Sequence, residues 1–371
     1  MAIVTLGDVA IESRETWKSD KNNIPIVGLE HLEPGEISLS KWDINSDNTF
    51  TKMFRKGQVL LGRRRVYLRK AVIAPTDGIC SGDITVIEAI PGKILPELLP
   101  FIIQNDRFFD YAMQGSAGSL SPRVKWEHLK EYKFQLPNLE EQKALVDKLW
   151  AAYNLKSSYN KLLAATDEIV KSQFIEMFGT LDNPKGKMES LGSMCNIQRG
   201  GSPRPISEYI TDQSDGLNWI KIGDTDDSMY ITKTEEKIKP SGLRKTRQVY
   251  AGDLLLSNSM SFGRPYILKI DGCIHDGWLV LHINDAKKLS PVYLCSYLSQ
   301  QGTYAEMAKL AAGGVVQNLN SNIVKQLDVI VPDMEEQIKY IQILDQADKS
   351  KFELRKSIEA IDAVIKSLIN S

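Results

Sequence analysis

A short basic stretch carries the side chains best suited to bind an anionic ligand. Arg63-Arg64-Arg65 and Arg69-Lys70, with Tyr67 between them, follow the apolar run Val59-Leu60-Leu61. Guanidinium groups bind phosphates and grip the edge of guanine with two hydrogen bonds. The stretch therefore predicts nucleic-acid contacts, with a solvated surface hairpin as the alternative.

An equivalent stretch, Asn258 to Arg264, lies 195 residues further along the chain. It is less basic, but it offers an asparagine amide, which pairs well with adenine. Different chemistry in two equivalent loops would read two different base sequences.

Polar loops that contain glycine supply further candidates. Glycine lets a backbone approach a ligand closely, and serine, arginine, glutamine and asparagine side chains can donate to phosphates or bases. Two loops, residues 115–123 and 313–319, precede a strand, with plain connecting loops as the alternative, and we expect a third, residues 198–204, to be flexible. The candidate side chains are Ser121, Arg123, Arg199, Arg204, Gln317 and Asn318.

Catalytic motifs are missing from the sequence. There is no G-x-x-x-x-G-K-[ST] phosphate loop, no G-x-G-x-x-G fingerprint, no H-E-x-x-H and no G-x-S-x-G elbow. The four histidines lack metal-ligand spacing apart from the wide pair His275 and His282, which we interpret as structural. The four scattered cysteines are expected to be small buried residues. The sequence therefore predicts no cofactor, no metal site and no enzymatic activity of its own.

The elements that must position these loops occur twice. One shift of 195 residues aligns three pairs of segments, Leu136–Gln142 with Val331–Gln337, Arg55–Leu61 with Tyr250–Leu256, and Ile26–Gly28 with Lys221–Gly223. Matches at one offset in separated places indicate a duplicated chain. At 371 residues the chain has room for two domains of ordinary size.

Each half combines short strands with helices. Apolar runs bounded by turn residues, such as Ile84–Ile87 and Trp278–Leu281, predict buried strands. Helices are expected around Pro96–Met113 and Pro291–Leu310. The predicted fold class is therefore α+β, with two similar, mixed, strand-rich globular parts.

A long helix is predicted after each globular part. Asn138 and Asp333 are good N-caps, and Glu141 and Glu336 lie three residues later, where a glutamate completes a capping box. Neither glycine nor proline occurs in residues 138–178 or 333–370. Each helix could therefore run about 40 residues, or about 60 Å.

An apolar seam favours pairing of the two helices. In the second helix the seam residues are spaced 4, 3, 4, 3 as in a coiled coil: Leu354, Ile358, Ile361, Ile365 and Leu368. The first helix has a weaker seam at the matching positions Tyr159, Leu163, Thr166, Val170 and Gln173. With a domain between them in one chain, the helices are predicted to form an antiparallel coiled coil. Helices that dock only on their own domains are the alternative.

Composition is that of an ordinary globular protein, with 42% hydrophobic and 25% charged residues. The net charge of −1 decides nothing about nucleic acid, because phosphate binding depends on local charge. No apolar run is long enough to span a membrane and no signal-peptide pattern is present, so a cytoplasmic location without membrane contact is expected.

These features together resemble the specificity subunit, HsdS, of type I restriction-modification enzymes. The motifs occur in order along the chain: Leu191-Gly192, Arg199-Gly200-Gly201-Ser202-Pro203, Trp219–Asp224, Ala251-Gly252-Asp253-Leu254-Leu255, and Val331-Pro332 with Glu336-Gln337 before a long helix. The first half departs from this pattern, because Ser13-Arg14-Glu15 stands where the glycine-serine-proline stretch would be.

The resemblance implies that each target-recognition domain reads one half of a bipartite site in double-stranded DNA. These domains would be residues 1–137 and 181–332, and the helices at 138–180 and 333–371 would be spacers. It also implies docking of two methyltransferase subunits, which bind S-adenosylmethionine, and of ATP-driven restriction subunits. Recognition and chemistry would then lie on different chains.

Two other functions stay open at this point. A coiled-coil scaffold or interaction protein would also have long helices and a net charge near zero. The chain could instead serve a related restriction enzyme in which methylation and cleavage share one polypeptide.

Overall fold

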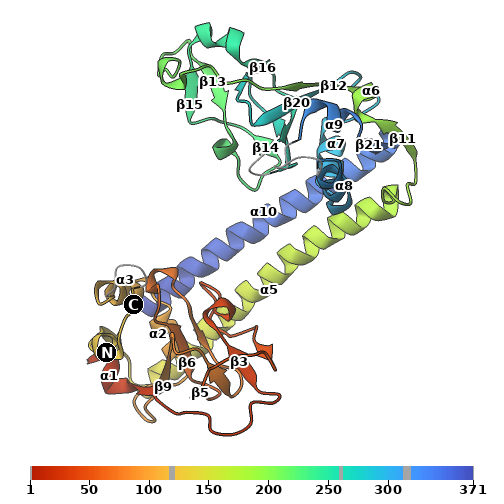
Figure 1. Ribbon diagram of the computed structural model, residues 1–371. Coiled ribbons are helices and arrows are strands. Elements are labelled where there is room, and N and C mark those ends of the chain that lie inside the picture. The colour runs from red at the N-terminus through yellow and green to blue at the C-terminus, as the bar shows by residue number, and fades with distance from the viewer. Residues whose placement is uncertain (1, 117–121, 259–261, 312–318, 371) are drawn as a thin grey trace. The chain divides into compact units, whose positions relative to one another are not determined.

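The structure, a computed structural model, describes residues 2–116, 122–258, 262–311 and 319–370. It divides into two compact units: unit 1 is residues 1–162 with 353–371, and unit 2 is residues 163–352. Each unit holds one globular part and a portion of both long helices, which are labelled α5 and α10 in Figure 1.

Unit 1 is built on two four-stranded sheets and one two-stranded sheet. The first sheet has the antiparallel order β2 (Ala10–Ser13), β9 (Ile84–Ala89), β6 (Val59–Gly62), β7 (Ala71–Ile73). The second has the order β4 (Asp43–Ile44), β3 (Pro25–Val27), β8 (Gly78–Cys80), β5 (Lys52–Phe54), in which only β3 and β8 are parallel. The third pairs β1 (Ala2–Thr5) with β10 (Lys133–Leu136), the strand that leads into α5.

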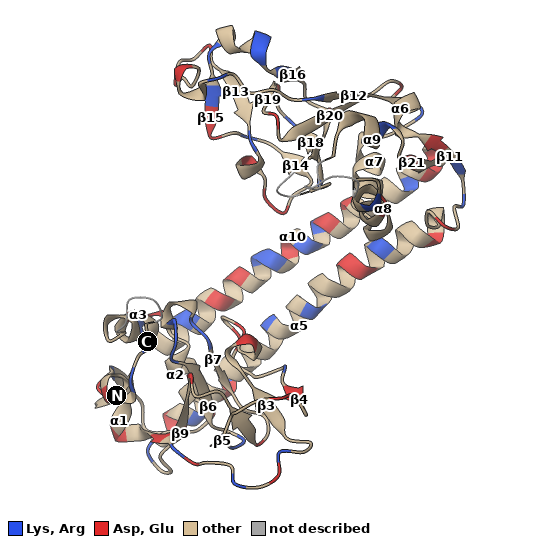
Figure 2. Ribbon diagram, viewed as in Figure 1, with Lys and Arg blue, Asp and Glu red and all other residues tan. Residues whose placement is uncertain are grey.

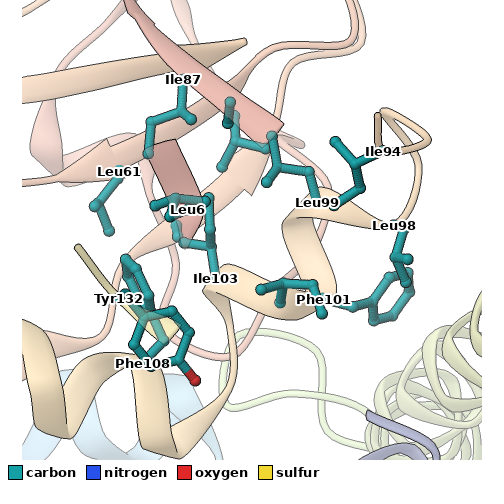
Figure 3. Packing of buried hydrophobic residues seen from close by; sticks show 14 of the residues in the cluster. Leu6, Leu61, Ile87, Ile94, Leu98, Leu99, Phe101, Ile103, Phe108 and Tyr132 are labelled. Carbon is teal, nitrogen blue, oxygen red and sulfur yellow. The ribbon is translucent and has the colours of Figure 1, made fainter. Parts of the chain in front are cut away.

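Helices cover the first sheet of unit 1 and form its main core. They are α1 (Leu6–Val9), α2 (Leu99–Ile103), α3 (Asp106–Gln114) and α4 (Trp126–Leu129), with the 3-10 turns η1 (Leu29–His31) and η2 (Val66–Leu68). Figure 3 shows Leu61 and Ile87 of the sheet facing Leu6, Leu99 and Ile103 of the helices. The region expected to be helical around residues 96–113 forms two helices, because the Asn105 side chain accepts a hydrogen bond from the main-chain N–H of Arg107 and starts α3 anew.

Unit 2 has the same plan. Its first sheet has the order β12 (Cys195–Arg199), β20 (Trp278–Ile283), β17 (Leu254–Ser257), β18 (Pro265–Leu268), β14 (Tyr230–Ile231). Its second has the order β15 (Glu236–Ile238), β13 (Leu217–Ile220), β19 (Gly272–Ile274), β16 (Arg247–Val249). The third pairs β11 (Lys187–Ser190) with β21 (Asp328–Val331). The shorter helices are α6 (Leu191–Met194), α7 (Pro291–Leu298), α8 (Gln301–Ala311) and α9 (Ser321–Lys325), with η3 (Ile206–Glu208), η4 (Ile222–Asp224) and η5 (Pro240–Lys245).

Strand order and direction therefore agree between the units, which confirms the α+β class and the duplication. Even the extra edge strand β14 has a counterpart, because Ser38 makes the same parallel bridge to β7 that Tyr230 makes to β18. The runs Ile84–Ile87 and Trp278–Leu281, predicted to be strands, lie in β9 and β20, and the apolar runs Val59–Leu61 and Leu254–Leu256 form most of β6 and β17.

The alignment of Gly28 with Gly223 is wrong by two residues. Val27 pairs with Cys80 and Ile220 pairs with Ile274, so Gly28, the N-cap of η1, corresponds to Lys221, the N-cap of η4. Loop length is the physical reason, because a single offset cannot follow loops of different length. From Ile26 to Leu60 is 34 positions, whereas from Trp219 to Leu255 is 36, so unit 2 has two extra residues there. The preceding segment differs more, because Ser13 to Ile26 is 13 positions and Gln198 to Trp219 is 21, which gives unit 2 eight extra residues.

The repeated turn before β6 and β17 has one structure in both units. Gly57 and Gly252 have φ of +87° and +98°, a conformation that favours glycine. The next side chain, Gln58 or Asp253, accepts a hydrogen bond from the main-chain N–H three residues before it. Gln58 also contacts Glu88, and Asp253 contacts His282 at 2.6 Å, so His282 has the structural role expected of it.

The long helices are α5 (Leu139–Phe178) and α10 (Met334–Asn370). The capping box of α5 is confirmed, because the N–H of Asn138 donates to Glu141 (3.1 Å) and the N–H of Glu141 donates to the Asn138 side chain (3.0 Å). At Asp333, by contrast, it is the main-chain carbonyl that accepts from the N–H of Glu336. No helix among the described residues is both long and apolar enough to cross a bilayer.

Within each unit the two helices run antiparallel. In unit 1, Lys156 of α5 pairs with Asp362 of α10 (2.6 Å), and the end of α10 packs on the same core as the start of α5. In unit 2, Asp167 pairs with Lys351 (3.1 Å). Every predicted seam position in both helices is half-buried between mostly exposed neighbours. Part of this burial comes from the globular parts, because Ile365 and Leu368 pack on the core of unit 1 and Val170 packs on the core of unit 2.

One glutamine fixes the first turn of each long helix to its globular part. Gln142 accepts from the N–H of Leu95 and donates to the carbonyls of Lys93 and Pro137. Gln337 makes the same three bonds with residues of unit 2, to the N–H of Ser290 and the carbonyls of Lys288 and Pro332, all at 2.9 Å. Both side chains are buried, so this junction explains why the glutamine occurs in both halves of the chain.

Replacing Gln337 by alanine is expected to lower the free energy of unfolding by about 1–3 kcal/mol, because buried partners lose their hydrogen bonds. Urea unfolding of the full chain measures the change. Gln342→Ala, an exposed position on the same helix, is the matched control and should change stability by less than about 0.5 kcal/mol. Equal effects of the two variants would contradict the role of Gln337.

The four cysteines are buried free thiols, as expected. Burial raises the pKa of Cys80, Cys195 and Cys295 to about 12 and that of Cys273 to about 11. The thiolate is the reactive form, so the native chain should react with a thiol reagent at pH 8 far more slowly than the urea-unfolded chain. In the unfolded chain all four cysteine thiols should react. A thiol that reacts at the unfolded rate in the native chain would show that its site opens.

Candidate nucleic-acid interface

In unit 1 the structure brings two candidate loops together. Arg64 and Arg123 form an isolated antiparallel bridge. The N–H of Arg65 donates to the carbonyl of Pro122 (2.9 Å), and the N–H of Val124 donates to the carbonyl of Arg63 (3.0 Å). The basic stretch after β6 is thus held beside the segment before α4, although about 60 residues separate them in the sequence.

An aspartate lies at the centre of this cluster. Asp83, in the turn between β8 and β9, accepts two hydrogen bonds from Arg123, at 2.7 and 3.3 Å, and lies 3.5 Å from Arg64. The hydrogen bond from Arg123 lowers the pKa of Asp83. The carboxylate is largely buried, whereas Arg64, Arg65 and Arg123 are partly or fully exposed. We call Arg63, Arg64, Arg65 and Arg123 the unit 1 arginine cluster.

The other two basic candidates in unit 1 have different partners. Arg69 binds Asp106 and lies 3.1 Å from Asp110, both on α3. Lys70 donates to the main-chain carbonyl of Leu29 (2.7 Å). Both side chains therefore tie elements of the domain together and do not join the arginine cluster.

Unit 2 repeats the loop pairing with other side chains. Asn258 takes the place of Arg63, because its N–H donates to Gly277 as that of Arg63 does to Asp83, and its carbonyl accepts from Leu319 as that of Arg63 does from Val124. The Asn258 side chain is fully buried, and its amide donates to the carbonyl of Asp276 (2.8 Å). Contrary to the expected adenine contact, this amide serves the loop scaffold.

Asp276 is the organising residue in unit 2. Its carboxylate accepts from the Ser202 hydroxyl (2.6 Å) and lies 3.8 Å from Arg204, while its carbonyl accepts from Arg199 (3.0 Å). The hydrogen bond from Ser202 lowers the pKa of Asp276. Arg199 and Arg204 are therefore brought together with Asn258. Arg264 is directed elsewhere, to the carbonyl of Asp226 (2.9 Å) and over the Tyr266 ring.

The glycines of residues 198–204 are packed, which corrects the expected flexibility. The N–H of Gly200 donates to Trp278 and that of Gly201 donates to Ile274. A Cβ atom on Gly200 would lie 2.1 Å from the carbonyl oxygen of His275, and one on Gly201 would lie 2.8 Å from that of Lys245. Glycine is required because neighbouring backbone passes too close for any side chain.

Three predicted site residues, Ser121, Gln317 and Asn318, lie outside the described residues. The described residues next to them, Pro122 and Leu319, belong to the paired loops.

Sequence reasoning missed two features of this region. The first is the pair of aspartates, whose only signal was a turn motif, Ser81-Gly82-Asp83 or His275-Asp276-Gly277, between two strands. The second is an exposed basic segment around η5, which Figure 2 shows as blue ribbon near β15 and β16 and which contains Lys237, Lys239, Arg244, Lys245 and Arg247. Lys245 contacts the Tyr209 hydroxyl (2.7 Å), and its carbonyl adjoins Gly201, so the segment borders the 198–204 loop. Its five cations within eleven residues were the signal.

The model of the type I restriction modification DNA specificity domain matches residues 1–165 and 185–362. The chain belongs to this family. A specificity subunit is a recognition subunit, so the chain is a non-catalytic part of a restriction-modification enzyme.

Curated relatives agree with the family. The EcoDI type I restriction enzyme specificity subunit of Escherichia coli is 29% identical over 129 residues, which are 34% of this chain and 28% of that protein's length. A protein of Methanocaldococcus jannaschii assigned as the MjaX type I specificity subunit is 22% identical and matches over 95% of this chain and 86% of its own.

Two solved structures show the same fold. A chain from a study of complex assembly and conformational transition of the type I restriction-modification system is 21% identical, with a TM-score of 0.62 over 99% of this chain and 96% of its own. The S subunit of a type I restriction-modification system from M. genitalium is 12% identical, with a TM-score of 0.56 over 100% of this chain and 95% of its own.

Proposed function

We propose that this specificity subunit reads a bipartite DNA site, one half-site with each globular part. The proposal rests on one observation: equivalent loops meet on the same scaffold in both units but carry different side chains. Arg64 and Arg123 meet in unit 1, and Asn258 and Leu319 meet at the corresponding place in unit 2. Because base edges are read by side chains and phosphates by charge, two such surfaces would recognise two sequences.

The proposed recognition domains are residues 1–137 and 181–332, and the proposed spacers are residues 138–180 and 333–371. In unit 1 the DNA contacts would come from the arginine cluster, with Ser121 from the same loop. In unit 2 they would come from Arg199 and Arg204, from the basic segment around η5, and from Gln317 and Asn318. The remaining candidates would affect DNA binding only through the scaffold that they stabilise. They are Arg69, Lys70, Asn258 and Arg264.

The partners of the proposal are two methyltransferase subunits and restriction subunits, which would supply the chemistry. A duplicated chain presents each kind of surface twice, which suits two copies of one partner.

Binding by the complex of this chain with its methyltransferase subunits tests the proposal. The probes are a duplex that carries the site found by mapping methylated bases and two duplexes in which one half-site is scrambled. Each scrambled duplex should bind at least tenfold more weakly, and binding should fall steeply as salt rises. A complex that binds no DNA would favour the scaffold function instead, and equal binding to all three duplexes would refute bipartite reading.

A further inference from the structure

In both units an aspartate lies in the turn before β9 or β20, the central strand of the first sheet that comes last in the sequence. In both units the neighbours of this aspartate are proposed DNA contacts. Asp83 precedes β9, and Asp276 lies two residues before β20. The two are not at equivalent positions, because Asp83 corresponds to Gly277 in the main-chain bonding of the loop. A carboxylate therefore lies in the same turn of both units, although the two aspartates are not at equivalent sequence positions.

A carboxylate is an unexpected group at a phosphate-binding surface, since it repels the ligand. Asp83 lies within the unit 1 arginine cluster and is only 19% exposed, so it cannot turn away from Arg64 and Arg123 into solvent. Its two bonds to Arg123 come from Nε and from one terminal nitrogen, which fixes the plane of the guanidinium group. These two bonds use two of the five guanidinium N–H groups, and the other three, two of them on the second terminal nitrogen, take no part in them.

Asp276 acts on its loop through a different set of bonds. Ser202 donates to its carboxylate, the main-chain N–H of Asp276 lies 3.4 Å from the same hydroxyl, and Arg204 is 3.8 Å away. The carboxylate therefore holds residues 200–204, which lie in the segment where unit 2 is eight residues longer, against the β19–β20 turn. Arg199 and Asn258 bind the carbonyl of the same residue.

Resting on the proposed function, we propose that Asp83 and Asp276 are positioning residues for base readout. Asp83 orients the Arg123 side chain and Asp276 orients the loop that carries Arg204, and each carboxylate offsets part of the nearby positive charge, which weakens attachment to phosphates of any sequence. The carboxylates thus raise the ratio of specific to non-specific binding without touching DNA. Asp83 acts through Arg123, and Asp276 acts through the loop that carries Arg204.

Asparagine variants test the proposal, because Asn keeps an acceptor oxygen and removes the charge. Asp83→Asn should weaken binding of the methyltransferase complex to its mapped site about tenfold, which corresponds to one bidentate base contact. Binding to a scrambled duplex should become several-fold tighter, with a steeper dependence on salt. Asp276→Asn should change both affinities in the same directions, and the loss of specificity should be at the other half-site.

The chain offers matched controls for both variants. Asp77 and Asp271 are exposed, and each accepts a hydrogen bond from the equivalent main-chain N–H, that of Lys56 or Ala251. Asp77→Asn and Asp271→Asn make the same charge change in the same units and should leave the ratio of specific to non-specific binding within about twofold.

A double-mutant cycle separates positioning from general charge. In an Arg123→Ala background, Asp83→Asn should no longer weaken binding to the mapped site, because the group that it positions is absent. Thermal unfolding of each complex checks that the variants fold.

The outcomes are distinguishable. If the wild-type complex fails to discriminate half-sites, the proposed function fails. If the wild type discriminates and Asp83→Asn changes the affinities for mapped and scrambled duplexes by one common factor, or changes neither, the aspartate has no positioning role and only this inference is overturned.

Discussion

Replacing Arg63, Arg64 and Arg65 together by alanine is expected to weaken binding to one half-site roughly 100-fold. The three residues belong to the unit 1 arginine cluster, where Arg64 and Arg65 are held against Pro122 and Arg123 by main-chain contacts. Three contacts of about 1 kcal/mol each sum to about 3 kcal/mol, at about 1.4 kcal/mol for each tenfold change. Fluorescence anisotropy with the complex and the mapped duplex measures the loss.

The matched control removes three cations from α5, with the substitutions Lys143→Ala, Lys148→Ala and Lys161→Ala at exposed positions of unit 1. We expect it to bind within a few-fold of the wild type. Co-purification of methyltransferase subunits with the arginine variant should be unchanged. Unaltered half-site affinity of that variant would remove the arginine cluster from the interface.

Replacing Phe174 by alanine is expected to have the largest effect on stability, about 3–5 kcal/mol. Phe174 is 2% exposed and lies near the end of α5 among the rings of Phe178, Tyr293, Tyr297 and Tyr340, with ring centroids 5.1–6.0 Å away. This cluster joins α5, α7 and the start of α10 within unit 2. Removing the ring leaves a cavity between three helices that cannot easily close.

Urea unfolding followed by circular dichroism measures that change. Ile175→Ala is the control, because the adjacent side chain is 48% exposed and should contribute less than about 1 kcal/mol. A loss below about 1 kcal/mol for Phe174→Ala would show that the aromatic cluster does not hold α5 to unit 2.

The fold could be predicted from the sequence wherever a local signal and the repeat coincided. The strands β6, β9, β17 and β20 are continuous apolar runs, and the coiled-coil seam is a regular spacing, so both needed only local reading. The Gly28 alignment failed because two loops differ in length and no short motif records the difference. The burial of Phe174 was missed because it lies one residue beyond the seam, on the side that faces the globular part.

The candidate site was less predictable because its geometry depends on contacts distant in sequence. That Arg63 lies beside Val124, and Asn258 beside Leu319, depends on tertiary hydrogen bonds that no periodicity reveals. For the same reason the sequence could not show that Arg69 is paired with α3 or that the Asn258 amide is buried. Asp83 and Asp276 appeared only as turn residues, since their importance comes from the arginines that the fold brings to them.

The most direct test of two equivalent reading units is to make them identical. In a chain whose residues 187–331 are replaced by a second copy of residues 2–136, β1 and β10 replace β11 and β21, and both long helices are kept. Methylated bases are then mapped genome-wide in cells that express this chain with its methyltransferase subunits. We predict a symmetric motif with two inverted copies of one half-site, whereas the wild-type chain gives two different half-sites. A motif that keeps the wild-type second half-site would contradict the account.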